Sequence, residues 1–304
     1  MPKKENSSRS KAYILLLITV VIWGIAGPVI KYTQRGISAL PFLTYRFFIS
    51  AIFGTLFIIF AKQIKKAEKE NILEIIVYGF LVSTVSLGLL FLGIQKTTIL
   101  DVALISAIAP LVSAIAGVIF LREIITKREK LGISIAFFGT LVTVADPLIK
   151  NGPGQSQFIG NLLVVGYITF NAVSSVMSKR LVRKRVNPLS LTNIAFIVGF
   201  LTLLPFVYLN GGVKDVVSQA MSLPFNYQLG VFFMALISGN LAYAMWIRAQ
   251  KTIEISEAGV FAYLIPVFSA PLAIFWLGEK ITTPLIIGAI FIAIGVYIAE
   301  KKKR

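Results

Sequence analysis

The sequence predicts an all-α membrane protein with ten transmembrane helices, arranged as two inverted repeats of five helices each. Three features predict this class: the composition, the spacing of the apolar runs, and an internal repeat. Of the 304 residues, 57% are hydrophobic and only 14% are charged, and the mean hydropathy is +0.84. Soluble globular chains have about 25% charged residues. The composition therefore places most of this chain in a lipid bilayer.

Ten apolar runs follow one another along the chain, each close to the ~20 residues that a helix needs to cross a bilayer. The run that begins at Ala12 has no convincing small-residue cleavage site, so it predicts a first span and not a signal peptide. Pro224 is expected to break the long run 216–247, and Asp146-Pro147 to end the fifth span. The expected spans are 12–32, 39–61, 72–95, 102–121, 130–147, 158–178, 188–209, 227–247, 258–277 and 281–299.

Lysine and arginine residues fall mostly on one side of these spans. With the N-terminus in the cytoplasm, the cytoplasmic segments carry 23 of them and the opposite loops carry 6, with Arg46 inside a span. This bias predicts a protein of the cytoplasmic membrane with both termini in the cytoplasm. The net charge of +17 is divided among these short clusters. It therefore indicates contacts with the lipid bilayer and no nucleic-acid partner.

Residues 101–145 recur without a gap at 257–301. Because five spans is an odd number, the second copy enters the membrane from the opposite side, as in transporters whose substrate site lies at a pseudo-twofold axis near mid-bilayer.

The expected divisions are a cytoplasmic N-terminus 1–11, repeats 12–147 and 158–299 around an external loop 148–157, and a cytoplasmic end 300–304. The matching pairs are Pro110 and Pro266, Ser113 and Ser269, Glu123 and Glu279, Thr126 and Thr282, Gly132 and Gly288, and Gly139 and Gly295.

Motifs in both halves match a known family. They are Trp23-Gly24 with Pro28 and Lys31, Arg46 in LTYRFFIS, and the paired segments VALISAIAPLVSAIAGVIFLRE and AGVFAYLIPVFSAPLAIFWLGE. Over about residues 12–299 the chain resembles the drug/metabolite transporter superfamily, specifically the EamA-type permeases. The resemblance implies two five-helix halves that move small organic solutes across the cytoplasmic membrane, often by exporting amino acids or other metabolites. It does not imply one substrate.

Polar side chains within the spans are candidate contacts for a small-molecule substrate. A hydrogen-bonding group in lipid is costly unless it has a partner, so such groups are expected to face the bundle interior. An aromatic cavity with scattered neutral polar groups suits an amphipathic solute such as an amino acid. The alternatives for each residue are an interhelical hydrogen bond or an interfacial aromatic belt. The candidates are Trp23, Arg46, Tyr78, Gln95, Ser106, Asn171, Asn240, Tyr243, Trp246 and Tyr263.

Prolines and glycines predict how the spans bend and pack. Pro110 and Pro266 lie within repeat-related spans, where a proline removes a backbone donor and kinks the helix, so we expect a pair of hinges. Gly132 and Gly139, like Gly288 and Gly295, are spaced to face one side of a helix. Rows of small residues let helices approach closely in lipid, either within one protomer or across a homodimer.

Arg46 is the one clearly internal charge among the predicted spans. An arginine at the centre of a membrane helix costs about 2.5–3.5 kcal/mol on insertion scales, so it needs a partner or water. Three explanations remain open from the sequence: it binds a substrate carboxylate, it forms a structural ion pair, or its long side chain reaches outward to the interface.

The missing residue types bear on the energy source. The chain has no histidine or cysteine, and its carboxylates lie at the ends of spans or in loops. The sequence therefore predicts uniport or exchange, with proton coupling through an edge carboxylate as the alternative. No phosphate-binding glycine loop is present, so no cofactor and no ATP hydrolysis are expected. Glu123 and Glu279 are expected to fix their adjacent turns. An enzyme or a channel is disfavoured.

Overall fold

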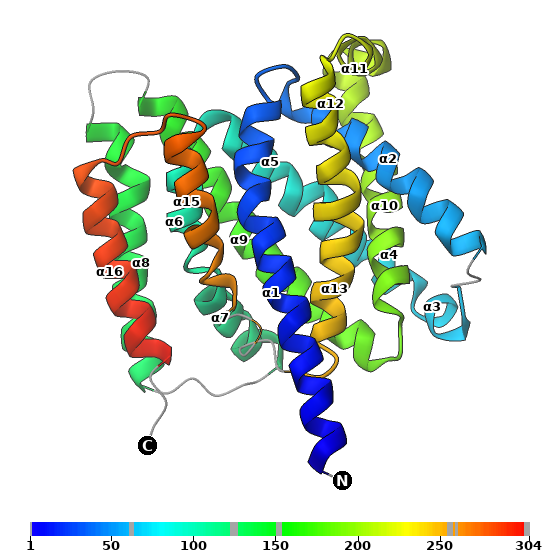
Figure 1. Ribbon diagram of the computed structural model, residues 1–304, viewed down its shortest axis with the longest axis horizontal. Helices are drawn as coiled ribbons and strands as arrows, with labels where there is room; N and C mark the ends of the chain where they lie inside the picture. Colours follow the sequence, from blue (N-terminus) through cyan, green and yellow to red (C-terminus); the bar gives the residue numbers. More distant parts are fainter. Residues whose placement is uncertain are drawn as a thin grey trace.

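The computed structural model describes residues 2–60, 64–121, 127–149, 154–253, 258 and 261–300. Over these ranges the regular structure is entirely helical. The long helices run roughly along one direction, and α1 begins at the same lower end of the bundle at which α16 ends (Figure 1). The predicted all-α membrane class agrees with this architecture.

Within the described ranges, six helical stretches are long and apolar enough to cross a membrane, or seven if one bent pair counts as a single span. Two of them contain a π-helical segment, marked η. The six stretches are α1 (Pro2–Thr33), α2 (Ala39–Phe60), the run of α4 (Ile72–Gly79), η1 (Phe80–Ser86) and α5 (Leu87–Lys96), α9 (Gly154–Arg183), α10 (Pro188–Leu209), and the run of α12 (Phe225–Phe232), η2 (Phe233–Leu241) and α13 (Ala242–Ala249).

The remaining helices are bent or shorter. The bent pair is α6 (Ile99–Ser106) and α7 (Ala109–Leu121), which meet at 41°. Shorter apolar stretches lie at Lys130–Thr143, Ile265–Phe275 and Thr283–Ile298. The ten crossings and their inverted arrangement stay a prediction. The other helices are α3 (Lys66–Glu70), α8 (Lys127–Ile149), α11 (Gly212–Met221), α15 (Ile265–Phe275) and α16 (Thr283–Glu300).

Two prolines lie where a helix restarts after a turn. Pro110 lies in the first turn of α7, after a turn at 107–108, and Pro266 lies in the first turn of α15, after a turn at 263–264. The 41° bend between α6 and α7 lies directly before Pro110 and agrees with the expected bend in this span, while the corresponding bend at Pro266 stays a prediction. In a first turn the missing N–H would have no helical partner anyway, so proline is well tolerated there. The hinge role of the two residues stays a prediction.

The structure confirms one helix boundary that the sequence predicts and contradicts another. α12 begins at Phe225 with Pro224 at its N-cap, as the sequence predicts. The expected stop at Asp146-Pro147 is wrong, because α8 continues through Pro147 to Ile149. The residue before proline is only biased against helical geometry, and this bias does not end α8.

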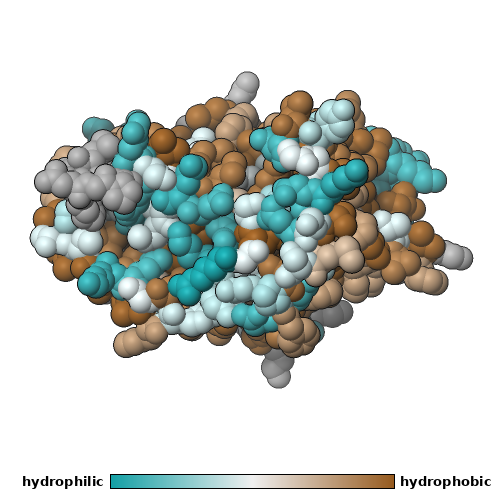
Figure 2. All heavy atoms as spheres, turned by 90° about the horizontal axis from the view of Figure 1, so that it is seen from above, coloured by the Kyte–Doolittle hydropathy of each residue, from teal (hydrophilic) through white to brown (hydrophobic). Residues whose placement is uncertain are grey.

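The outer surface of the bundle is apolar. Large hydrophobic side chains are exposed along its flanks, as the lipid-facing side of a membrane protein requires. Seen from above, hydrophilic residues gather across the middle of the upper end, while hydrophobic residues form much of the rim (Figure 2). Examples of exposed side chains are Ile14, Phe60, Leu73, Phe120, Leu201 and Phe275.

The glycine rows bring α8 and α16 into backbone contact. A Cβ atom on Gly139 would lie 2.8 Å from the carbonyl oxygen of Gly288, and one on Gly288 would lie 2.9 Å from the carbonyl oxygen of Gly139. The two helices run side by side at one edge of the bundle (Figure 1). These rows therefore pack within one protomer, and the homodimer stays a prediction.

We predict that Gly139→Ala destabilises the protein by about 1–3 kcal/mol, because the added methyl group overpacks the α8–α16 contact. Gly88→Ala is the matched control: nothing lies within 4 Å of a Cβ at Gly88, and alanine is favoured over glycine inside a helix. Thermal unfolding in detergent, followed by circular dichroism, measures both variants. An equal shift for the two would contradict close α8–α16 packing.

Candidate functional site: a central cavity with a buried arginine

A cavity of about 190 Å³ is enclosed by helices from both predicted halves of the chain. Its wall combines side chains from α1, α2, the α4–η1–α5 run, α6 and α7 with side chains from α9, the η2–α13 run and α15. Eight of the predicted residues line it. They are Trp23, Arg46, Tyr78, Ser106, Pro110, Asn171, Tyr243 and Trp246.

Four other predicted residues do not line this cavity. Gln95 lies in a second pocket at the upper end of the bundle. Asn240 is buried and donates a hydrogen bond from Nδ2 to Oδ1 of Asn193, at 2.7 Å. Tyr263 and Pro266 are half-buried in and just after the turn before α15, and neither is among the wall residues in the described part of the chain.

Arg46 is the most deeply placed charge in the cavity wall. Only 1% of the residue is exposed, and its guanidinium carbon lies 5.2, 5.3 and 5.7 Å from the ring centres of Phe47, Phe91 and Phe196. Cation–π contacts of this kind contribute about 0.5–2 kcal/mol each. They therefore offset much of the cost of burying the charge, but they supply no hydrogen-bond acceptor. Nε and Nη2 of Arg46 have no hydrogen-bond partner.

An aromatic cluster lies next to this arginine. Trp23 packs against Tyr243 at 5.1 Å and against Trp246 at 5.0 Å between ring centres. Phe196 contacts both Arg46 and, edge-on at 5.6 Å, Tyr243. Trp23 is fixed by a hydrogen bond from Nε1 to the carbonyl oxygen of Ser238, at 3.2 Å. Because Ser238 belongs to η2, the π-helix positions the cluster.

The upper end of the cavity is closed by apolar side chains and by contacts between helix ends. Ile30, Ile94 and Ile99 line this end and are almost fully buried. Above them, Lys31 Nζ donates hydrogen bonds of 2.7 Å to the carbonyl oxygens of Ile94 and Thr97. The end of α1 is thereby tied to the connection between α5 and α6.

Glu279 completes this closure from the loop between α15 and α16. Its carboxylate accepts hydrogen bonds from the backbone N–H groups of Ile99, at 2.7 Å, and Leu100, at 2.9 Å. A carboxylate at the start of a helix is favoured by the free N–H groups and the helix dipole. The expectation that Glu279 fixes its own adjacent turn is therefore wrong, since it caps α6. Its repeat partner Glu123 lies outside the described residues.

The environment of Glu279 also shifts the pKa of its carboxyl group. Burial raises the pKa of this carboxyl group, while the two backbone hydrogen bonds and Lys31 act in the opposite direction and Asp101 adds to the rise. Glu279 also lines the second pocket. It is therefore a carboxylate at the edge of the membrane region with a raised pKa.

The sequence model of the EamA-like transporter family matches this chain twice, over residues 10–145 and 158–300. The chain belongs to this family. The two matches together cover most of the chain, and both contribute helices to the cavity wall. With its long apolar helices, the chain is a multi-pass membrane transporter.

Similar proteins come from archaea and bacteria. A protein of Archaeoglobus fulgidus named uncharacterized transporter is 29% identical, over 96% of this chain and 100% of that protein. The uncharacterized transporter YyaM of Bacillus subtilis is 30% identical, over 95% of this chain and 93% of that protein. A probable amino-acid metabolite efflux pump of Escherichia coli is 22% identical, over 94% of this chain and 93% of that protein. A crystal structure 16% identical in sequence shares the fold, with a TM-score of 0.62 over 95% of this chain and 97% of that one.

Several wall residues of this EamA protein were not among the sequence candidates. Tyr167 precedes Asn171 by one helical turn, and the face continues through Ser174 and Ser178, so the helical period could have identified it. Gln250 and Ser269 also line the cavity and are buried. Among the described residues, no group of three or more His, Cys, Asp or Glu side chains could hold a metal ion.

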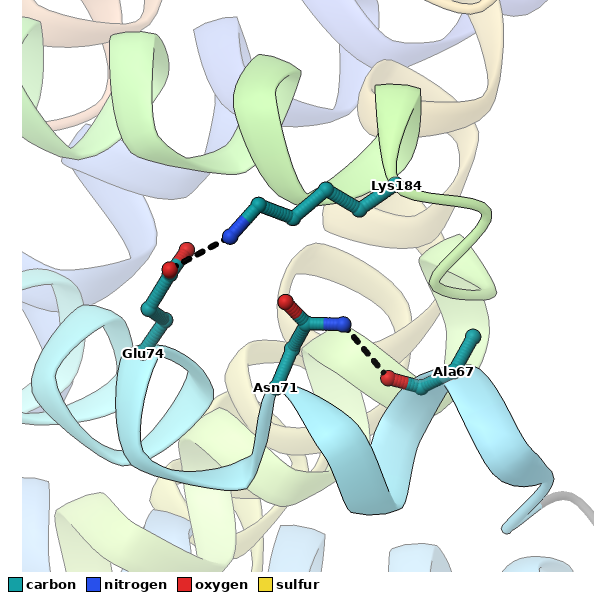
Figure 3. A network of polar contacts seen from close by, with 4 residues as sticks. All are labelled: Ala67, Asn71, Glu74 and Lys184. Atoms are coloured by element: carbon teal, nitrogen blue, oxygen red, sulfur yellow. Dashed lines mark hydrogen bonds and ion pairs between the residues drawn. The ribbon is translucent and has the colours of Figure 1, made fainter.

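The lower end of the bundle is held by ionic and polar contacts. Lys184, which follows α9, forms an ion pair with Glu74 of α4, and Asn71 donates to the carbonyl oxygen of Ala67 (Figure 3). The buried Glu68 accepts a hydrogen bond of 2.8 Å from the backbone N–H of Asn187. The contacts of Glu74 and Glu68 join α4 and the segment before it to the connection between α9 and α10.

We predict that Glu279→Ala loosens the upper closure, because the N–H groups of Ile99 and Leu100 lose their acceptor. Since the chain has no cysteine, Ser106→Cys can report access to the cavity wall through a membrane-impermeant maleimide added on the side where α6 begins. Leaving buried donors unpaired costs about 1–3 kcal/mol each, so labelling should rise roughly tenfold. Glu70→Ala, at an exposed pair with Lys66, is the control and should leave the rate unchanged.

The same reporter has a predicted pH dependence. Because the pKa of Glu279 is raised by burial, the closed state binds a proton more tightly than a state in which this carboxyl faces water. Closure is therefore strongest below the ordinary pKa of glutamate and weakens as the pH rises through the raised pKa. Labelling of Ser106→Cys, divided at each pH by the labelling rate of a free thiol because the thiolate is the reactive form, should increase over that interval, and Glu279→Gln should remove the dependence. Labelling that slows as the pH rises would contradict this sign.

Proposed function

We propose that this EamA-family protein is a carrier that moves small amphipathic organic solutes through the central cavity by alternating access, as a uniporter or exchanger. The observation that carries the proposal is one cavity bounded by both copies of the family sequence and closed at one end by contacts between helix ends. An inverted pair of units around a central site is the usual basis of alternating access.

The breaks in the helices support this mechanism. The α6–α7 break and the turn before α15 lie beside the cavity, and η1 and η2 lie in the third and eighth predicted spans. Irregular backbone at membrane depth is tolerated where protein or a water-filled cavity covers it, and π-helical turns occur frequently at functional sites. We propose that these four places take up the movement, with Pro110 and Pro266 beside two of them.

Export across the cytoplasmic membrane, with both termini in the cytoplasm, is the direction that we propose. The bias of lysine and arginine supports the orientation. Two relatives, in Escherichia coli and Salmonella typhimurium, are named probable amino-acid metabolite efflux pumps. An efflux role agrees with a small cavity whose wall is aromatic and mostly neutral.

Proton-coupled export is the second candidate, and Glu279 is the observation that favours it. A coupling carboxylate needs a pKa that responds to the state of the transporter, and burial raises the pKa of Glu279 in the closed state. Opening the upper end would expose this carboxyl group to water, where it binds a proton less tightly than in the closed state.

A transport assay separates these candidates. Cells that overexpress the protein are first screened for tolerance to toxic metabolites, and a solute found in this way is used in proteoliposomes. We predict saturable uptake that is accelerated by unlabelled solute on the opposite side and proceeds without a pH gradient. Uptake that occurs only with a pH gradient, and is lost in Glu279→Gln, would establish the proton-coupled candidate instead. Ohmic conductance would show a channel and overturn the carrier proposal.

A further inference from the structure

The structure removes two of the three explanations that the sequence leaves for Arg46. An arginine that reaches the membrane surface would be exposed, but only 1% of Arg46 is. A structural ion pair needs a nearby carboxylate, and within the described residues the ion pairs join Lys66 to Glu70 and Lys184 to Glu74. A ligand carboxylate is the explanation that remains.

The free atoms of Arg46 have the geometry of a carboxylate receptor. Cation–π contacts with Phe47, Phe91 and Phe196 involve the faces of those rings, whereas the guanidinium N–H donors lie in the plane of the group. Nε and Nη2, which have no partner, form one side of the guanidinium fork. Two parallel N–H donors on that side bind both oxygens of a carboxylate.

The residues around the free Nε and Nη2 donors of Arg46 favour an anion with an apolar body. Arg46 is the one formally charged residue in the described part of the cavity wall, so a single carboxylate would neutralise it. A Cβ at Gly239 would lie 3.2 Å from Nη2, so a larger residue at this position would crowd the guanidinium. Through Phe196, the guanidinium adjoins the cluster of Trp23, Tyr243 and Trp246.

We propose that Arg46 is the carboxylate-binding residue of the cavity and that the solute is a small organic acid with an aromatic or other apolar body. The carboxylate is held side-on by Nε and Nη2, and the body packs against the cluster of Trp23, Tyr243 and Trp246. This proposal rests on the carrier function above for the identity of the cavity as the transport site. The binding of an organic acid there can be measured without any transport.

The test uses two probes of the same shape, 3-phenylpropionate and its neutral analogue 3-phenylpropanamide, titrated calorimetrically into the purified full-length protein in detergent. Because hydrogen bonds to a charged group are about twice as strong as neutral ones, the carboxylate should bind roughly 10- to 100-fold more tightly than the amide. Equal binding of the two probes to the unmodified protein would overturn the proposal without the use of any variant.

Variants then test whether Arg46 causes the preference for the carboxylate probe over the amide probe. Arg46→Gln should remove the difference between the probes, and Arg46→Lys should keep only part of it, because lysine retains the charge but not the planar fork. Arg183→Gln, the same change at an exposed arginine at the end of α9, should keep the full preference. A carboxylate preference that persists in Arg46→Gln would overturn the proposal. If Arg46→Gln does not fold, Arg46→Lys becomes the deciding variant. A preference of Arg46→Lys for the carboxylate that equals that of the unmodified protein would then overturn the proposal.

The failure of the proposed function has a different signature. If 3-phenylpropionate binds through Arg46 but no solute from the metabolite screen shows accelerated exchange in proteoliposomes, then the carrier proposal fails and the anion site stands. If exchange is observed for solutes that lack a carboxylate and is unaffected by Arg46→Gln, then the carrier stands and the assignment of Arg46 fails.

Discussion

A lipid bilayer holds no water for the backbone, so every polar group released where a helix breaks must find a partner inside the protein. This constraint organises the closure above the cavity. The first N–H groups of α6 are bound by Glu279, and the last carbonyl oxygens around α5 are bound by Lys31. These bonds join segments that are distant in the sequence. Closure therefore depends on a few replaceable hydrogen bonds, whereas the glycine contact of α8 with α16 is a rigid packing interface.

The cavity beneath this closure combines two features that an organic solute with one charged end would need. Its aromatic cluster supplies apolar surface, and Trp23 is oriented by a bond to the π-helix η2. The guanidinium of Arg46 supplies a buried charge that three rings stabilise without using its hydrogen-bond donors. A protein selected only for stability would pair that charge, since an unpaired buried donor is costly. The unpaired donors are the observation on which the proposed carboxylate site rests.

Sequence reasoning located the long apolar helices, and most of the residues that it proposed do line the cavity, because hydropathy and the 3.6-residue period are local signals. It could not foresee the π-helices, which depend on tertiary contacts, and this accounts for one misplaced residue. A place for Asn240 in the cavity wall beside Tyr243 and Trp246 assumes α-helical rotation, but Gly239 and Asn240 lie in η2. Gly239 consequently lies beside Arg46, and Asn240 bonds to Asn193. The partner of Glu279 was missed because it lies on a helix remote in sequence.

The most direct test of the account is whether one residue of the cavity wall can be reached from both sides of the membrane. Ser175 lines the cavity, and Ser175→Cys would be the single thiol of a chain that has no cysteine. The account predicts that an impermeant maleimide modifies this thiol from either face of oriented membrane vesicles, and that a transported solute slows both reactions. Modification from one face alone, or rates that the solute leaves unchanged, would contradict a shared cavity with alternating access.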